Sequence, residues 1–334
     1  MDIIKEKNTL KTLNLFYEEP DPDRWFKYDH YARKIIRRVV RGKPVPGGQF
    51  MVYHNLVKGL TKLGVPYRLN DYKYIDKHPD EIACIIGKDP VLFEKKWKSP
   101  IVFGSSFGIN PVTNPEILKE FPIKKLIVPG PWLKEMFAPY GSENVEIWPV
   151  GIDTELWHQV DRSKRYDFLI YNKIRWDHQR MNEELVEPLK QLLKIHHLTF
   201  TEITYGHYKP SELKAKLAEC HYAIFLCEHE TQGIAYQQIL SSGIPVLAWD
   251  RGGYWQDPYW FPNRIKFQPV SSVPYWDDYC GVKFSSISNF EHSLTKFLDL
   301  AGSGFFKPRD YILQNLTLEK CAAAYVKIIS SIQT

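Results

Sequence analysis

The chain of 334 residues is 44% apolar and 14% aromatic, which predicts two globular domains, each long enough for its own core. Its net charge of +5 permits an anionic ligand or membrane surface but requires neither. The sequence shows no signal-peptide pattern, no apolar run of membrane-spanning length and no metal-like pairing of its five cysteines, so we expect a cytoplasmic protein with free thiols.

The first half of the sequence alternates short apolar runs with helical or loop segments. Strands are expected at residues 13–17, 67–69, 82–86, 101–103, 126–128 and 145–148. A helix follows the breaker PVPGG and ends at Gly64, and Gly47 and Gly48 at its start let a ligand approach the backbone closely. This alternation is typical of a parallel sheet with crossover helices, so the predicted fold class is α/β.

A basic segment lies between the first strand and this helix. Apolar residues recur there at helical spacing, and Arg33–Arg41 adds many positive charges. One interpretation is a surface for phosphates or anionic lipid, which would place the protein peripherally at the inner face of a membrane. The other is the solvated face of an ordinary helix. No nucleic-acid module accompanies the charge, so nucleic acid is not an expected partner.

The turn-rich sequence WPVGIDTELW separates the two halves of the chain. We place one domain at residues 1–152, a second at 153–316, and a last helix at 317–334 that packs back toward the first domain. Further helices are expected at 181–193, where Pro188 kinks the helix or starts a new one, after a Ser211 cap, and at 288–300. Ser288 and Glu291 are expected to form a capping box, and Thr317 is expected to cap the last helix.

Charged residues follow the expected strands of the second half, at 166–171, 200–205, 222–226 and 244–248. The carboxyl ends of parallel strands form the edge at which open α/β sheets bind ligands. Lys173, Arg175 and Arg180 follow the first strand and are suited to a diphosphate, although surface charge is the alternative. Glu230 follows the third strand. The helix that begins near Gly233 directs its free N–H groups toward the same edge.

An aromatic and proline-rich segment follows Asp250. Its tryptophans and tyrosines are suited to stacking on a sugar ring or a base. The alternative is that they pack a long irregular segment.

The sequence HETQGIAYQQILSSGIPVL, with WPVGIDTELW and PGGQF, resembles retaining GT-B glycosyltransferases of the group 1 class (sequence family 4). The resemblance implies two Rossmann-like domains whose parallel sheets face each other across a cleft, the first at residues 1–152 on the acceptor side and the second at 153–316 binding the nucleotide sugar. It also implies a hexosyltransferase that moves a sugar from a nucleotide donor, UDP- or GDP-sugar, to a hydroxyl of a glycan, glycolipid or small molecule. No cofactor is expected, and since no cluster of metal-ligating residues is evident we expect transfer without a metal.

The resemblance also implies roles for individual residues. The catalytic set is Glu230, Lys173 and Arg175, with Glu230 on the donor sugar and the two cations on the departing diphosphate. The donor-binding set is Gly47, Gly48, Gln232, Gly233, Ile234, Gln238, Arg180 and His207.

Three departures from the family pattern leave alternatives open. Gln238 stands where the family has a second acid, so a charge is lost although the amide still binds a ribose. The basic pair lacks the usual spacing. GSSFG replaces the expected histidine, so no catalytic base is visible. A catalytically degenerate nucleotide- or sugar-binding protein of the same fold is therefore the main alternative, and an epimerase, a hydrolase or a basic-helix membrane or nucleic-acid binder are lesser ones.

Overall fold

The computed structural model describes residues 11–19, 24–26, 29, 32–33, 47–87, 89–93, 95–104, 110–160 and 163–332. Most of the expected basic helix and of the GSSFG sequence lies outside the described residues. The chain divides into two compact units. Unit 1 comprises Met1–Val128, Glu143–Glu146 and Ala322–Thr334, and unit 2 comprises Pro129–Ser142 and Ile147–Cys321. The proposed boundaries at residues 152 and 316 stay predictions.

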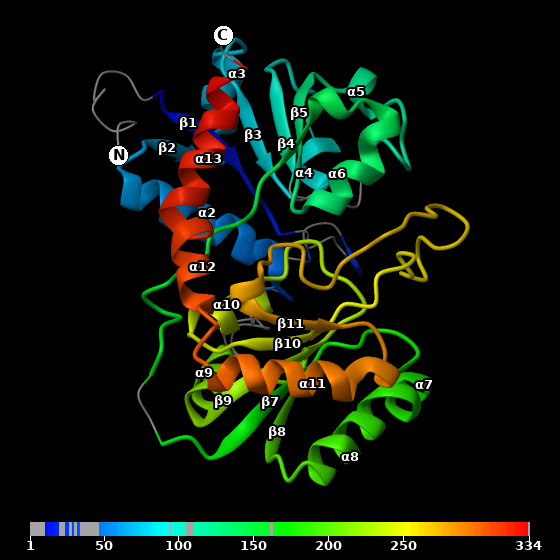
Figure 1. Ribbon diagram of the computed structural model, residues 1–334. Helices are drawn as coiled ribbons and strands as arrows, with labels where there is room; N and C mark the ends of the chain where they lie inside the picture. Colours follow the sequence, from blue (N-terminus) through cyan, green and yellow to red (C-terminus); the bar gives the residue numbers. More distant parts are fainter. Residues whose placement is uncertain are drawn as a thin grey trace. The chain divides into compact units, whose positions relative to one another are not determined.

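Unit 1 is built on a sheet of strand order β2-β1-β3-β4-β5-β6 (Figure 1). The strands are β1 (Leu13–Phe16), β2 (Tyr67–Leu69), β3 (Ala83–Ile86), β4 (Ile101–Gly104), β5 (Ile123–Val128) and β6 (Val145–Ile147). The helices among them are α2 (Gly48–Leu63), α3 (Tyr72–Lys77), α4 (Asp89–Phe93) and α5 (Ile117–Glu120). Every residue of β1, β3 and β4 is buried, as expected for parallel strands covered on both faces.

Unit 2 contains a second parallel sheet, of order β11-β10-β9-β7-β8. Its strands are β7 (Tyr166–Asn172), β8 (Phe200–Thr204), β9 (Cys220–Leu226), β10 (Val246–Trp249) and β11 (Gly281–Phe284). Its helices are α6 (Pro131–Phe137), α7 (His178–Met181), α8 (Glu187–Ile195), α9 (Pro210–Glu219), α10 (Ile234–Ser241), α11 (Ile287–Gly302) and α12 (Pro308–Asn315). The last helix of the chain is α13 (Leu318–Ser330).

The second sheet has an apolar core on each face. Along β9, Ala223 and Phe225 belong to one core with residues of α9 and α10, and Ile224 and Leu226 belong to the other with residues of α8 and α11. This alternation follows from the period of two in a strand. Helix α11, orange in Figure 1, covers the second of these faces. The predicted α/β class is therefore confirmed.

The helical segment after β7 contains an irregular turn directly before Pro188. A π-helical turn (Asn182–Val186) separates α7 from α8, and Pro188 lies in the first turn of α8. The backbone stays helical through Val186 and Glu187, so the π-turn widens the helix directly before Pro188, which cannot donate an N–H to the preceding turn. Pro188 thus coincides with an irregular turn in a continuous helical segment, and the choice between a kink and a new helix start stays a prediction.

Two predicted helix caps are wrong. Lys209, not Ser211, is the N-cap of α9, because Pro210 already occupies the first helical turn. The capping box of α11 is formed by Ser286 and Asn289 rather than Ser288 and Glu291. Several serines precede this helix, and the buried face of Phe290, Leu294 and Phe297 is compatible with the earlier start.

The cap of α13 is as predicted, since the backbone N–H of Lys320 donates to Thr317 Oγ1 over 3.2 Å. This helix has a buried, mostly apolar face that consists of Leu318, Cys321, Ala322, Tyr325 and Ile329. Among the described residues, no helix combines the length and apolar composition needed to cross a bilayer.

Candidate functional site

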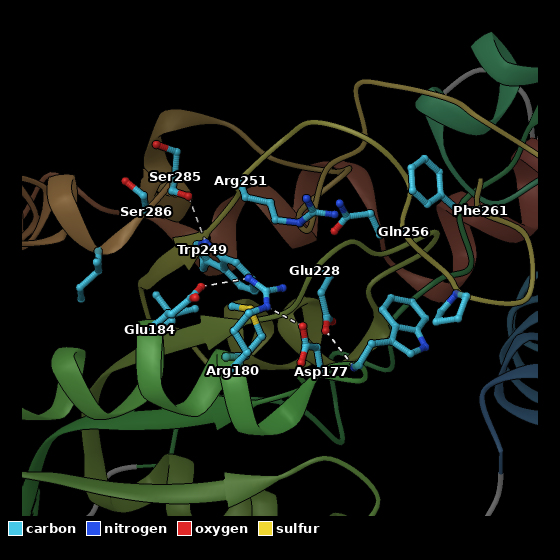
Figure 2. A pocket seen from close by; sticks show the side chains of 15 residues that line it. Asp177, Arg180, Glu184, Glu228, Trp249, Arg251, Gln256, Phe261, Ser285 and Ser286 are labelled. Carbon is cyan, nitrogen blue, oxygen red and sulfur yellow. Dashed lines mark hydrogen bonds and ion pairs between the residues drawn. The ribbon is translucent and has the colours of Figure 1, made fainter.

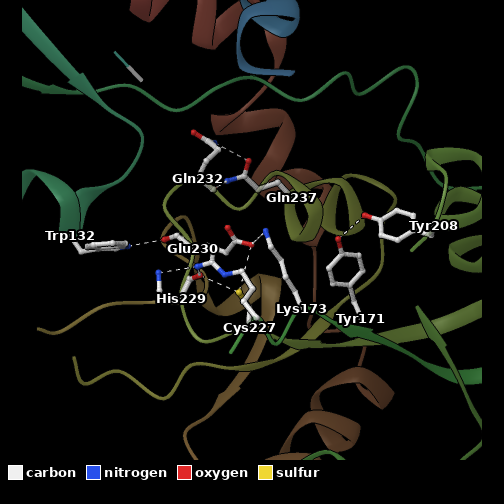
Figure 3. Close-up of polar contacts among 10 residues, drawn as sticks. Trp132, Tyr171, Lys173, Tyr208, Cys227, His229, Glu230, Gln232 and Gln237 are labelled. Atoms are coloured by element: carbon white, nitrogen blue, oxygen red, sulfur yellow. Dashed lines mark hydrogen bonds and ion pairs between the residues drawn. The ribbon is translucent and has the colours of Figure 1, made fainter. Parts of the chain in front are cut away.

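An ion pair joins the loops that follow two neighbouring strands of unit 2. β7 and β9 pair in parallel with Asn172 opposite Leu226, so the residues after them emerge side by side. Lys173 Nζ binds Glu230 Oε1, and the two side chains are only 11% and 9% exposed (Figure 3). The structure therefore brings together two of the three predicted catalytic residues at the carboxyl edge of the sheet.

The ammonium group of Lys173 stays charged although it is buried. Burial is the largest influence and lowers the pKa of Lys173, but the charge and hydrogen bond of Glu230, together with Cys227 and Tyr205, outweigh it and hold this pKa above its ordinary value of 10.5. The Lys173 ammonium also lies over the ring of Tyr205, 4.4 Å from its centroid. At neutral pH the site thus holds a fixed positive and a fixed negative charge.

The loop that carries Glu230 is anchored from several directions. The backbone N–H of Glu230 donates to Ser271 O over 2.9 Å, and its carbonyl accepts from the indole N–H of Trp132 over 2.8 Å. A side chain on Gly130 would collide with Thr231 O, so the backbones pass in close contact there. These contacts hold the carboxylate in one position without using its oxygens.

Arg175 lies beside the pair and contacts His229. Its Nη2 is 3.0 Å from His229 Nε2, and its guanidinium lies 4.3 Å from the ring centre of Trp176. Glu228 Oε1 accepts from the backbone N–H groups of Arg175 and Trp176, over 2.9 and 3.1 Å. The predicted cation is thereby held at the same edge as Lys173.

His229 is neutral in this environment. Burial, followed by the positive charges of Arg175, Arg251 and Lys173, lowers the pKa of His229 well below its ordinary value of 6.5. An arginine can only donate, so Nε2 of His229 accepts and its proton resides on Nδ1. The imidazole is surrounded by three indole rings, those of Trp132, Trp176 and Trp255.

The start of α10 lies immediately after Glu230 in the sequence. Gly233 is its N-cap with φ of +79°, and no side chain caps this helix end. A Cβ on Gly233 would overlap the ring of Tyr236, so both the backbone angle and the space require glycine. The N–H groups around Gly233 and Ile234 are thus the first donors of the helix, where an anion is favoured.

Gln232 is buried, and its amide makes internal hydrogen bonds. Its Oε1 accepts from the N–H of Val150 over 3.0 Å, and its Nε2 contacts Gln237 Oε1 at 3.2 Å. Gln237 is fully buried, whereas Gln238, the residue aligned with the family's second acid, is half-buried. Gln232 therefore connects the WPVGIDTELW sequence, through Val150, to α10.

The remaining predicted residues lie in other surroundings. Arg180 is 53% exposed and pairs with Asp177 and Glu184. His207 is exposed in the turn after β8. Gly47 and Gly48 belong to unit 1, where they are exposed at the start of α2. The roles assigned to all of these residues stay predictions.

The residues around His229 were not found by sequence reasoning. Trp132, Trp176 and Trp255 come from separate segments of unit 2, so no local spacing connects them. Glu228 was visible as an acid after β9, but its bonds to the backbone beyond β7 depend on the pairing of the strands.

No family model and no curated protein sequence matches this chain. Solved structures do match it. Sucrose-phosphate synthase from Thermosynechococcus elongatus superposes with a TM-score of 0.59 at 11% identity, covering 96% of this chain and 99% of that one. The apo form of the lipopolysaccharide outer core galactosyltransferase WaaB gives 0.55 at 12% identity, with 96% and 100% covered.

A third similar structure is a mutant of S. aureus TarM in complex with fondaparinux, alpha-GlcNAc-glycerol and UDP. Its TM-score is 0.52 at 13% identity, and the match covers 87% of this chain but 60% of TarM. At these identities the likeness concerns the fold. The chain thus has the two Rossmann-like α/β units of the GT-B fold, as expected from the sequence.

Proposed function

We propose that this protein transfers a sugar from a nucleotide-sugar donor, with UDP or GDP as its nucleotide, to a hydroxyl group of a glycan, glycolipid or small molecule. The observation that carries the proposal is the buried pair of Lys173 and Glu230 beside the start of α10, in a chain of GT-B fold. The presence of UDP in the TarM complex supports a nucleotide donor.

The proposed chemistry needs positive charge where the leaving diphosphate develops negative charge. Lys173, Arg175 and the N–H groups near Gly233 and Ile234 supply it from fixed positions, and preorganised donors of this kind are effective in transfer reactions. Because these groups belong to the protein, we propose that transfer proceeds without a metal.

The carboxylate of Glu230 accepts hydrogen bonds from hydroxyl groups of the donor sugar in this proposal. Its Oε1 is engaged by Lys173 in the free protein, and a carboxylate has lone pairs left for further donors. We further propose that Gln238 faces the ribose, that Gly47 and Gly48 admit the diphosphate or acceptor, and that the anomeric configuration is retained.

A thermal-shift screen of the full chain against UDP, GDP, ADP, CMP and dTDP, with their sugars, tests donor binding. A ligand at about a hundredfold excess over its Kd stabilises the folded state by about 2.7 kcal/mol, which raises the melting temperature. We expect one nucleoside diphosphate to do so. The test variant is Arg175→Met, which should reduce the shift, and its control is Lys214→Met at a half-buried position of α9, which should preserve it.

The same donor is then incubated with acceptor sugars, and the product is followed by NMR, which also reports its anomeric configuration. Product formed equally with and without EDTA supports metal-independent transfer. Nucleotide binding without any transfer or donor hydrolysis would instead support a catalytically degenerate binding protein. The absence of any nucleotide-induced shift in folded protein would contradict the proposal.

A further inference from the structure

A cavity of about 720 Å³ opens at the carboxyl edge of the second sheet, beside the ion pair but separate from it. Segments that follow β7, β9, β10 and β11 contribute to its lining (Figure 2). Glu228 lines it, whereas Lys173, Arg175 and Glu230 do not. Its volume lies within the range of small-molecule binding sites.

The walls of this cavity combine flat apolar rings with hydrogen-bonding groups. Trp176, Trp249 and Phe261 contribute rings, and Arg251, Gln256 and Ser285 contribute polar groups. This is the composition that binds a ring with one apolar face and hydroxyl groups around its rim, since the ring packs on an aromatic face and the hydroxyls need donors and acceptors.

The carboxylate of Glu228 offers an acceptor in the cavity wall. Glu228 is 6% exposed, and its Oε1 is occupied by two backbone N–H groups. Within the described part of the chain, its Oε2 has no hydrogen-bond partner. A buried carboxylate oxygen normally has one, and because this oxygen has almost no accessible surface, a ligand hydroxyl reaches it only with a small movement of the cavity wall.

The cavity wall carries no excess of positive charge, because two arginines, Arg180 and Arg251, stand against three carboxylates, Asp177, Glu184 and Glu228. Arg180 pairs with both Asp177 and Glu184, and the positive charge of Arg251 is opposed by the charge of Glu228. At the start of α11 the capping box already accepts from the backbone N–H groups of Ser286 and Asn289, so fewer of them are left for an anion. These features disfavour a phosphate and favour an uncharged ligand.

We propose that this cavity binds an uncharged saccharide. Its role in transfer, which rests on the proposed function, is to hold a sugar of the glycan acceptor or product near the ion pair of Lys173 and Glu230. Both interpretations of the aromatic segment after Asp250 therefore apply: part of it packs internally and part of it lines the proposed saccharide site. Trp255 and Trp260 are buried and stack with ring centres 5.8 Å apart, whereas Phe261 and Gln256 face the cavity.

The test is saccharide binding to the full chain, measured by saturation-transfer NMR with glucose, galactose, mannose, N-acetylglucosamine and their disaccharides. At least one should bind saturably. Phe261→Leu keeps apolar bulk but removes the ring, and should weaken that binding about tenfold. Tyr259→Leu is the matched control: this aromatic lies two residues away, is 63% exposed and does not line the cavity, so binding should be unchanged.

A second variant guards against a folding defect in Phe261→Leu. Gln256→Ala changes an exposed side chain in the cavity wall and should also weaken binding while the melting temperature is unchanged. Equal binding by both cavity variants and the wild type would overturn the inference, as would the absence of saturable binding by every saccharide.

Saturating nucleoside diphosphate separates this inference from the proposed function. Saccharide binding that persists with the nucleotide bound supports a distinct site, and mutual exclusion would overturn it by making the cavity part of the donor site. Saccharide binding in a protein that binds no nucleotide would support the cavity and contradict the transferase. Nucleotide binding without saccharide binding would support the donor site of the proposed transferase and contradict the saccharide site in the cavity.

Discussion

Lys173 and Glu230 follow different strands, lie 57 residues apart in the sequence, and form an ion pair that is almost fully shielded from solvent. Each charge depends on the other, because an isolated charge in such surroundings is strongly disfavoured. The pair therefore links the stability of unit 2 to the residues proposed to act on the donor.

Removal of one partner should destabilise the protein more than removal of both. Lys173→Met leaves a buried carboxylate and is expected to lower the free energy of unfolding by about 3 kcal/mol. The double variant Lys173→Met/Glu230→Leu should recover part of that loss. Urea unfolding of the wild type, the single variants and the double variant measures this coupling.

The control is the exposed pair of Lys119 and Glu116, whose side chains are 76% and 57% exposed. Its removal should change stability by no more than about 0.5 kcal/mol. Strictly additive effects of the two buried substitutions would contradict the coupling.

The stabilising effect of the pair should disappear at high pH. The pKa of Lys173 is raised in the folded chain, so its contribution is complete below the ordinary lysine value of 10.5 and is lost as the pH rises through the folded value. The difference in unfolding free energy between the wild type and the double variant should thus be constant near neutrality and should shrink in strong alkali. A difference that stays constant across this range would show that the pair does not titrate.

Glu230→Gln should abolish most of the transfer activity. Glutamine keeps the shape of the side chain but loses the charge and one acceptor, and we expect a fall in kcat of at least about a hundredfold. Because the substitution also leaves Lys173 unpaired, the assay is run at a temperature where circular dichroism shows the variant to be folded. Glu212→Gln on the exposed face of α9 is the control and should keep wild-type turnover. Wild-type turnover by folded Glu230→Gln would remove this residue from the mechanism.

The strands were predictable because most of them are buried on both faces and read as short apolar runs. β11 was not predicted, because its sequence GVKF is not a clear apolar run. It has four residues, begins at Gly281 with φ of +149°, and follows a long irregular aromatic segment. α12 was also missed, since its sequence PRDYILQN shows little apolar periodicity.

In the candidate site, sequence position after a strand identified Lys173, Arg175 and Glu230, because parallel strands end at one edge. It did not show that Lys173 and Glu230 bind each other, nor that the amide of Gln232 is bonded to Val150. Such contacts depend on side-chain direction and on residues far apart in the chain, which no local pattern contains.

The neutral His229 should make the protein sensitive to acid. Its pKa is well below 6.5 in the folded chain, so below pH 6.5 the unfolded chain binds a proton that the folded chain does not. Stability should then fall with falling pH, by at most about 1.4 kcal/mol per pH unit from this residue. His229→Gln should show a shallower dependence in urea unfolding, while His207→Gln, at an exposed position, controls for loss of an imidazole. Identical slopes for all three proteins would contradict the assignment.

Gly233→Ala tests whether the start of α10 needs glycine for space as well as for backbone angle. Gly206 offers a matched control, since its φ of +82° is close to the +79° of Gly233 but nothing lies within 4 Å of a Cβ built there. Gly206→Ala should therefore lower stability by about 1 kcal/mol, which is the effect of the angle alone. Gly233→Ala adds a collision with Tyr236, a fully buried ring, and should cost clearly more in thermal unfolding. It should also reduce donor binding, because the displaced backbone carries the N–H groups proposed to meet the donor; equal losses in the two variants would show that the space beside Tyr236 adjusts freely.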